Sequence, residues 1–285
     1  MNIREIATTI EPQEARDGAG VLLRRSIATR ALDQLDPFLL LDHFGSTRAC
    51  DYEAGFPLHP HRGIETVTYM LEGSVRHKDS TGREGVIGKG DVQWMSAGRA
   101  IMHEEMPQVA PEGNFGFQLW VNLPKSEKMS RPRYQEFRAG EIPSVELEGG
   151  GMIKIVAGTV DGVVGAVTDI VAQPTYLDVH LPEGKRFTQP IPRGHAAFAY
   201  LYEGDASFGK EDVRVQGPRL VVFKDGDAVT AQPIGGPARF LLVSGAPIRE
   251  PIARYGPFVM NTPEEIRETL EELRDGRFAD MASQR

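Results

Sequence analysis

The chain has 285 residues, with 32 Lys or Arg against 40 Asp or Glu, so its formal net charge is −8. This acidic balance argues against direct binding of nucleic acid, because neutralising phosphates requires a clustered basic face. The single cysteine, Cys50, excludes an intramolecular disulfide framework and any site built from several thiolates.

Targeting signals are not visible in the sequence. No apolar run approaches the ~18 residues that a membrane-spanning helix needs. The first residues lack the basic segment and apolar core of a secretory signal. We therefore expect a cytoplasmic protein with no membrane partner.

The predicted elements are mostly short strands. With 31 Gly and 20 Pro, the chain is rich in residues that form tight turns. Short runs with β-branched or aromatic content alternate with Gly, Pro and Asp, a rhythm typical of β-sandwiches and barrels. In chain order, the clearest runs are Thr66–Leu71, Asp91–Met95, Phe115–Leu123, Met152–Val156, Ala196–Tyr202, Leu220–Phe223 and Arg239–Val243.

An internal repeat divides the chain into two halves. The segment His59–Gly73 matches Pro190–Gly204, which lies 131 residues later, at five of 15 positions. In each half a Gly-Asp pair and then an apolar strand follow the matching segment. We therefore predict an all-β fold of two similar antiparallel β-barrels, residues 1–140 and 141–255, followed by a tail, residues 256–285.

The tail has the pattern of an amphipathic helix. Thr262 is suited to the N-cap, Pro263 to the first helical position, and Glu265 to the third position of a capping box. The apolar residues Ile266, Leu270 and Leu273 then recur at helical spacing. We expect this helix to pack against one or both barrels, with a partner-binding role as the alternative.

Two pairs of potential metal ligands share the spacing of a strand. His59 and His61 are two residues apart, as are His103 and Glu105, and such side chains leave the same face of a strand. If the two strands are neighbours in one barrel, three imidazoles and one carboxylate can converge. This donor set suits Fe(II), Mn(II), Ni(II), Cu(II) or Zn(II). A surface or turn role is the alternative for either pair alone.

Other histidines are interpreted as structural. His77 precedes Lys78 and Asp79 in a predicted hairpin, and we expect it to be a solvated turn residue. We expect His43 to make a structural hydrogen bond. In the second half, Pro190 and Pro192 occupy the positions that match His59 and His61, so the second barrel is predicted to hold no metal.

Several segments carry a resemblance to a known family. They are Phe38-Leu-Leu-Leu-Asp-His-Phe44, His59-Pro-His-Arg-Gly-Ile-Glu-Thr-Val67, Gly90-Asp-Val-Gln-Trp-Met-Ser-Ala-Gly98, His103-Glu-Glu-Met106, Leu119-Trp-Val-Asn-Leu123 and Gly256-Pro-Phe-Val-Met-Asn-Thr262. Together they resemble the pirin family of the cupin superfamily. The resemblance implies two cupin barrels (a bicupin), with one iron-type metal ion in the first barrel.

The resemblance also implies specific ligands. Carried over residue by residue, they are His59, His61, His103 and Glu105, the same set as the strand spacing indicates. The general cupin pattern has a glutamate ligand in its first motif, with a glycine at a fixed distance after it. Here Gly73 lies farther from Glu65 than in that pattern, so Glu65 does not match the ligand position. We therefore interpret Glu65 as a residue behind the ligands, paired with Arg62.

Two functions are compatible with this resemblance. Some pirins resemble dioxygenases that open flavonols such as quercetin with O2 and release carbon monoxide. In that case the metal would be Fe(II), and the substrate hydroxyl would bind to it. Glu105 would accept the proton of that hydroxyl, and Phe56 would line the mouth of the site. The alternative is a metal- or redox-responsive regulator that binds a transcription factor or a metabolic enzyme. In either case, we expect a monomer.

Overall fold

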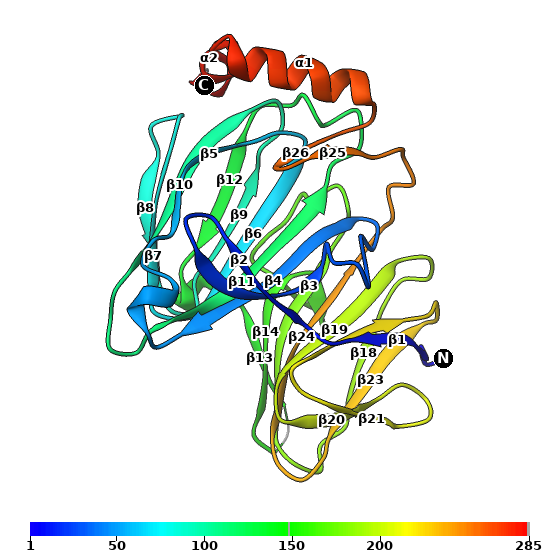
Figure 1. The fold of residues 1–285 in the computed structure, drawn as a ribbon. Helices are drawn as coiled ribbons and strands as arrows, with labels where there is room; N and C mark the ends of the chain where they lie inside the picture. Colours follow the sequence, from blue (N-terminus) through cyan, green and yellow to red (C-terminus); the bar gives the residue numbers. More distant parts are fainter. Residues whose placement is uncertain (148, 284–285) are drawn as a thin grey trace. The chain divides into compact units, whose positions relative to one another are not determined.

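The computed structural model describes residues 1–147 and 149–283. It contains two compact units, each built around a β-barrel (Figure 1). Among the described residues, the unit built around the N-terminal barrel comprises residues 14–28, 38–139 and 248–283. The unit built around the C-terminal barrel comprises residues 1–13, 29–37, 140–147 and 149–247. The predicted all-β fold of two barrels with a C-terminal helix is confirmed.

The units are not the contiguous stretches 1–140, 141–255 and 256–285 that the sequence predicted. The first strand, β1 (Ile6–Ile10), pairs with β22 (Arg219–Phe223) and so joins the C-terminal barrel. Conversely, residues 248–285 return to the N-terminal barrel. Both differences arise because segments far apart in the sequence form backbone hydrogen bonds. The pattern of residues within a strand does not predict such pairing.

The N-terminal barrel consists of a seven-stranded and a four-stranded antiparallel sheet. The larger sheet has the order β12 (Arg133–Phe137), β9 (Val92–Ser96), β6 (Ile64–Glu72), β11 (Asn114–Asn122), β4 (Phe38–Ser46), β3 (Val21–Ile27) and β2 (Gln13–Asp17). The smaller sheet has the order β5 (Phe56–His61), β10 (Ile101–Gln108), β7 (Ser74–Asp79) and β8 (Glu84–Ile87). Short 3₁₀ helices occur at Ala49–Asp51 and Ala139–Glu141.

The C-terminal barrel repeats this topology. Its larger sheet has the order β1, β22, β19 (Ala196–Glu203), β24 (Ala238–Gly245), β17 (Thr175–Leu181), β14 (Gly151–Ala157) and β13 (Ser144–Leu147). Its smaller sheet has the order β18 (Phe187–Pro190), β23 (Ala228–Pro233), β20 (Asp205–Phe208) and β21 (Val213–Gln216). A separate two-stranded hairpin consists of β15 (Thr159–Val160) and β16 (Val163–Val164). Apart from the edge strands β12 and β1, which come last and first along the chain, the strands occupy matching positions in the same chain order, and this supports the internal repeat found in the sequence.

Two pairs of glycines show why the repeated segments fold alike. Gly63 and its counterpart Gly194 have φ angles of 76° and 79°, and Gly73 and its counterpart Gly204 both have a φ of 75°. Residues other than glycine seldom adopt this left-handed conformation, so each pair marks the same turn at the same place in both barrels.

The interiors of the two barrels differ. In the C-terminal barrel an apolar cluster fills the interior, with the Phe240 ring centroid 5.7 Å from that of Phe187 and 5.5 Å from that of Phe208. In the N-terminal barrel, buried polar side chains such as His61, His103 and Glu105 accompany the apolar ones. An apolar core stabilises a barrel, whereas buried titratable groups in a barrel interior are costly and point to a site.

The tail packs against the N-terminal barrel. A hairpin of β25 (Ala253–Tyr255) and β26 (Phe258–Met260) leads into helices α1 (Pro263–Arg274) and α2 (Arg277–Ser283). The predicted capping box is confirmed: the Thr262 hydroxyl accepts a hydrogen bond from the Glu265 amide, and the Glu265 carboxylate accepts one from the Thr262 amide. Within the described residues, no helix is long and apolar enough to cross a membrane.

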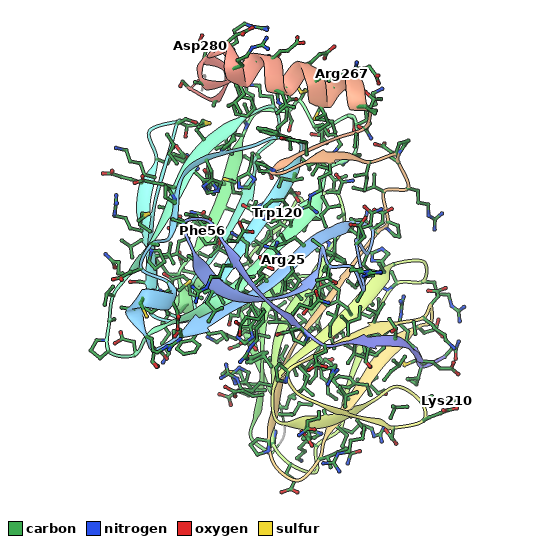
Figure 2. All side chains as sticks on the ribbon, in the orientation of Figure 1. Arg25, Phe56, Trp120, Lys210, Arg267 and Asp280 are labelled. Atoms are coloured by element: carbon green, nitrogen blue, oxygen red, sulfur yellow. The ribbon has the colours of Figure 1, made fainter. Side chains whose placement is uncertain are left out.

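The two faces of the tail helices have different surroundings. Ile266, Phe278 and Ala282 form an apolar cluster with Ala100 and Phe258 of the barrel and its hairpin. Arg267 and Asp280 lie on the exposed side of the helices (Figure 2). The tail helices therefore cover one end of the N-terminal barrel.

Candidate metal centre

Three histidines converge inside the N-terminal barrel. Strands β5 and β10 are hydrogen-bonded neighbours, and their register places His103 opposite His59. One ligand nitrogen from each of His59, His61 and His103 lies within 4.8 Å of the others. The two strands are therefore neighbours, as predicted, and together they form a three-histidine cluster able to bind a metal ion.

The hydrogen bonds around this cluster leave nitrogen lone pairs facing inward. The Nδ1 atom of His59 lies 2.9 Å from the carbonyl oxygen of Pro57, which can only accept, so Nδ1 carries the proton. The Nε2 atom of neutral His59 then has a lone pair, and it lies 3.1 Å from Nε2 of His61. Two nitrogens held this close are well placed to share one cation.

Burial keeps two of the imidazoles neutral. Burial lowers the pKa of His61 well below its usual value, and the nearby His59 lowers it further. The pKa of His103 is likewise lowered well below its usual value, first by burial and then by His61 and His59. The buried Nε2 atom of His103 has no hydrogen-bond partner among the described residues. Neutral imidazoles are the form in which histidine binds metals, so these residues fit a metal ion.

Glu105 lies beside the cluster but is not part of it. Its side chain is buried, and its two oxygens accept hydrogen bonds from the Thr68 hydroxyl at 3.1 Å and the Gln118 amide at 3.3 Å. The neighbouring Glu104 is partly exposed and forms an ion pair with Arg76 at 3.4 Å. Strand alternation thus directs His103 and Glu105 to the interior and Glu104 to the outside.

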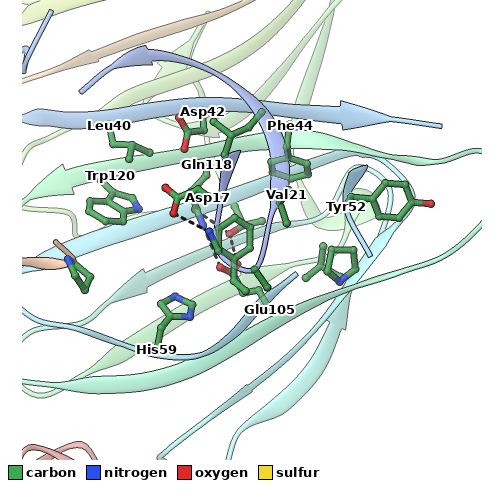
Figure 3. A pocket seen from close by; sticks show the side chains of 18 of the residues that line it. Asp17, Val21, Leu40, Asp42, Phe44, Tyr52, His59, Glu105, Gln118 and Trp120 are labelled. Atoms are coloured by element: carbon green, nitrogen blue, oxygen red, sulfur yellow. Dashed lines mark hydrogen bonds between the residues drawn. The ribbon is translucent and has the colours of Figure 1, made fainter. Parts of the chain in front are cut away.

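A cavity of about 550 Å³ opens onto the histidines (Figure 3). A volume in this range accommodates a drug-sized aromatic molecule. His59, His61 and Glu105 line it, as does Phe56, the predicted mouth residue, and Trp120. The Trp120 ring stands edge-on to His61, with centroids 5.2 Å apart. The remaining lining combines apolar side chains with a few polar ones, among them Asp17, Arg25, Asp42 and Gln118.

Arg62 and Glu65 do not form the predicted pair. Arg62 donates hydrogen bonds to Glu272 at 2.7 Å and to Thr269 at 2.8 Å, both on α1, and its guanidinium lies 4.8 Å from the centroid of the Phe278 ring. Glu65 accepts a hydrogen bond from Ser96 at 2.6 Å, and burial raises its pKa although that bond lowers it. Arg62 directly follows β5 and does not line the cavity, and its contacts with α1 anchor the tail helices.

The interpretation of His77 as a solvated turn residue is wrong. His77 lies within β7, is buried, and stands opposite Glu105 in the β7–β10 register. Its Nε2 atom is 3.1 Å from a carboxylate oxygen of Glu136. His43 stacks on Phe117 with centroids 4.7 Å apart, and burial lowers its pKa to about 4.

The described residues of the C-terminal barrel include no equivalent cluster. Where the N-terminal barrel pairs His59 with His103, the register of β18 and β23 pairs Pro190 with Ala228. Neither side chain can bind a metal ion. Among the described residues, His59, His61 and His103 are the one group of three or more ligand-type side chains close enough to hold an ion.

Some residues at the cavity were missed in the sequence. Asp17, Arg25 and Asp42 form a charged cluster on its wall, and Thr68 and Gln118 hold Glu105. Asp42 belongs to one of the segments that resemble the pirin family, but nothing in the sequence connects Asp17 or Arg25 with the histidines. Their placement depends on how β2 and β3 extend the larger sheet.

Two barrels of matching topology, one with a histidine cluster, define a bicupin with one candidate metal centre. Family models for "Pirin" and for the "Pirin C-terminal cupin domain" match residues 20–121 and 176–279. The chain is 44% identical to a "Pirin-like protein" of Caulobacter vibrioides over 279 residues, covering 98% of this chain and 100% of the relative. The chain belongs to the pirin family.

Two further similarities concern relatives named for an activity. A protein of Pseudomonas aeruginosa named "Putative quercetin 2,3-dioxygenase" is 43% identical over 270 residues, covering 93% of this chain and 94% of the relative. The crystal structure of quercetin 2,3-dioxygenase from Acinetobacter baumannii matches with a TM-score of 0.87 and 34% identity, covering 97% of this chain and 98% of the other.

Proposed function

We propose that this protein is a metal-dependent dioxygenase that opens an aromatic enol of the flavonol class, such as quercetin, with O2. The observation that carries the proposal is a three-histidine cluster and a buried carboxylate on the wall of one aromatic-sized cavity. The names of the two relatives above support the same reaction class.

The ligands in this proposal are His59, His61, His103 and Glu105, with Fe(II) as the metal. These residues would supply three nitrogen ligands and one oxygen ligand, a mixed donor set that suits Fe(II). When bound, the metal acts as a Lewis acid that favours the anionic form of a substrate hydroxyl.

Glu105 is the proposed base. It lines the cavity, and its hydrogen bonds from Thr68 and Gln118 leave lone pairs available on both carboxylate oxygens. A substrate hydroxyl beside it can transfer its proton to one of these oxygens, which converts the enol into the more reactive enolate. Thr68 and Gln118 fix the carboxylate in the orientation for this transfer.

The apolar lining positions the rings of the substrate. Phe56 and Trp120 offer aromatic surfaces on which a flavonol can stack, and the two residues lie close to His59 and His61, respectively. Excluding water from such a pocket strengthens the interactions of the carboxylate with the bound hydroxyl. The net reaction balances when both atoms of O2 enter the ring-opened product and one ring carbon leaves as carbon monoxide.

Turnover of quercetin tests the proposal. Protein loaded with Fe(II) is mixed with quercetin in air-saturated buffer, and the loss of flavonol absorbance and the release of carbon monoxide are followed. We expect both signals in equal molar amounts, well above the rate with free Fe(II). A rate equal to that of free metal would contradict the proposal.

A metal-responsive regulator is a second candidate, favoured by one contact. Arg62 directly follows His61 and binds Glu272 and Thr269 of α1, so the tail helix is connected to the metal-binding strand. Absence of turnover, together with a change in protease sensitivity of the tail on metal binding, would favour this function.

A further inference from the structure

A charged cluster on the cavity wall has no role in the proposed chemistry. Arg25 donates from Nε and Nη2 to the two carboxylate oxygens of Asp42, at 2.8 and 2.7 Å. Its Nη2 also donates to Asp17 at 2.6 Å. All three residues line the same cavity as His59 and Glu105 (Figure 3).

The cluster carries one carboxylate more than its cation neutralises. Arg25 and Asp42 are largely buried and form a bidentate ion pair, whereas the side chain of Asp17 is 50% exposed. Burial raises the pKa of Asp17, but hydrogen bonds from Arg25 and from the Gly18 amide outweigh it and leave the pKa below its usual value. Asp17 is therefore an ionised acceptor at neutral pH, with lone pairs open toward the cavity.

Arg25 also has N–H donors that Asp17 and Asp42 do not use. A guanidinium has five N–H groups, and the hydrogen bonds to Asp17 and Asp42 use those of Nε and Nη2. The two N–H groups of Nη1 make no hydrogen bond to the described residues. The wall thus presents an anionic acceptor and a cationic donor side by side.

The acceptor is held in place by the backbone. Asp17 ends β2, and Gly18 follows with a φ of 59°, a conformation that suits glycine. The Ala19 amide donates to the Gly55 carbonyl at 3.0 Å, directly before Phe56. This contact ties the turn to the strand that carries His59, which limits how far Asp17 can move relative to the histidines.

We propose that Asp17 and Arg25 form a specificity site for two adjacent hydroxyl groups on the aromatic ring of the substrate that lies away from the metal centre. One hydroxyl donates to the Asp17 carboxylate, and its neighbour accepts from Nη1 of Arg25. This inference rests on the proposed function for its substrate class, and it narrows that class to flavonols with a vicinal dihydroxyphenyl ring.

Binding of three flavonols under anaerobic conditions tests the inference without requiring turnover. The Fe(II)-loaded protein is titrated with quercetin, kaempferol and galangin, which carry two, one and no hydroxyl groups on the outer ring. A hydrogen bond to a charged group corresponds to about tenfold or more in affinity. We therefore expect quercetin to bind at least ~10-fold more tightly than galangin, with kaempferol between them.

Substitution of Asp17 tests whether this residue causes the preference for quercetin over galangin. In Asp17→Asn and Asp17→Ala, the ratio of quercetin to galangin affinity is expected to fall by about tenfold, since the charged acceptor is lost while the Arg25 donor remains. Glu112→Gln removes the same charge from an exposed position outside the cavity lining, and it should keep the wild-type ratio. Circular dichroism and the melting temperature show whether each variant is folded.

Each outcome decides one of the two claims. A wild-type ratio near one, a ratio that survives both Asp17 substitutions, or no binding of any flavonol would overturn the specificity site. A preference that depends on Asp17 in a protein that does not turn quercetin over would support the specificity site and contradict the dioxygenase.

Discussion

Replacing Glu105 separates its chemical role from that of its neighbour Glu104. Glu105→Gln keeps the size of the side chain and its bond from Thr68, and rotation of the Gln118 amide restores the second hydrogen bond. The variant should therefore fold. It loses the charge and the base, and loss of a general base typically lowers the rate by about 10²–10⁴. We expect a loss of that order in quercetin turnover, with part of the metal retained.

Glu104→Gln is the matched control. Glu104 pairs with Arg76 at 3.4 Å, and both side chains are partly exposed, so the pair contributes about 0–1 kcal/mol to stability. Neither residue lines the cavity. We expect turnover within about twofold of wild type. The assay is kcat for quercetin loss, with iron content measured by elemental analysis of the same samples. If Glu104→Gln abolished turnover and Glu105→Gln did not, the assignment of the interior face of β10 would be wrong.

Three further predictions concern the metal, the tail and a buried lysine. His59→Ala or His61→Ala should lose the metal and remain folded, and full metal occupancy by elemental analysis in either variant would refute their assignment as ligands. Arg62→Met leaves a largely buried Glu272 without its cation. This should lower the free energy of unfolding by about 3 kcal/mol and the melting temperature by ~6 °C. An unchanged melting temperature would show that the pair does not anchor the tail. Burial lowers the pKa of Lys128 to about 8 from 10.5, so the unfolded chain binds more protons between these values and stability should rise across that pH range. Chemical denaturation should show this rise in wild type and not in Lys128→Met, and equal slopes would contradict it.

Features that depend on local sequence were predictable. The capping box needs only Thr262 and Glu265, three residues apart, and the structure contains it. The shared face of His59 and His61 follows from the period of a strand, because alternate side chains point the same way. The matching turns at Gly63 and Gly194 follow from a repeat that is visible in the sequence.

Features that depend on long-range pairing were not predictable. Arg62 binds Glu272, which lies 210 residues later, and no pattern around Arg62 indicates that partner. The burial of His77 depends on β7 lying between β8 and β10 and not at the edge of the sheet. Asp17 reaches the cavity because β2 joins the larger sheet, whereas the strand before it, β1, joins the other barrel.

We predict that one metal ion binds in the N-terminal barrel. Anomalous diffraction at the iron edge, from crystals of the Fe(II)-loaded protein, locates the ion directly. We predict a single peak per chain, enclosed by His59, His61 and His103, with a carboxylate oxygen of Glu105 at ligand distance. A peak in the C-terminal barrel, or no peak among the three histidines, would contradict it.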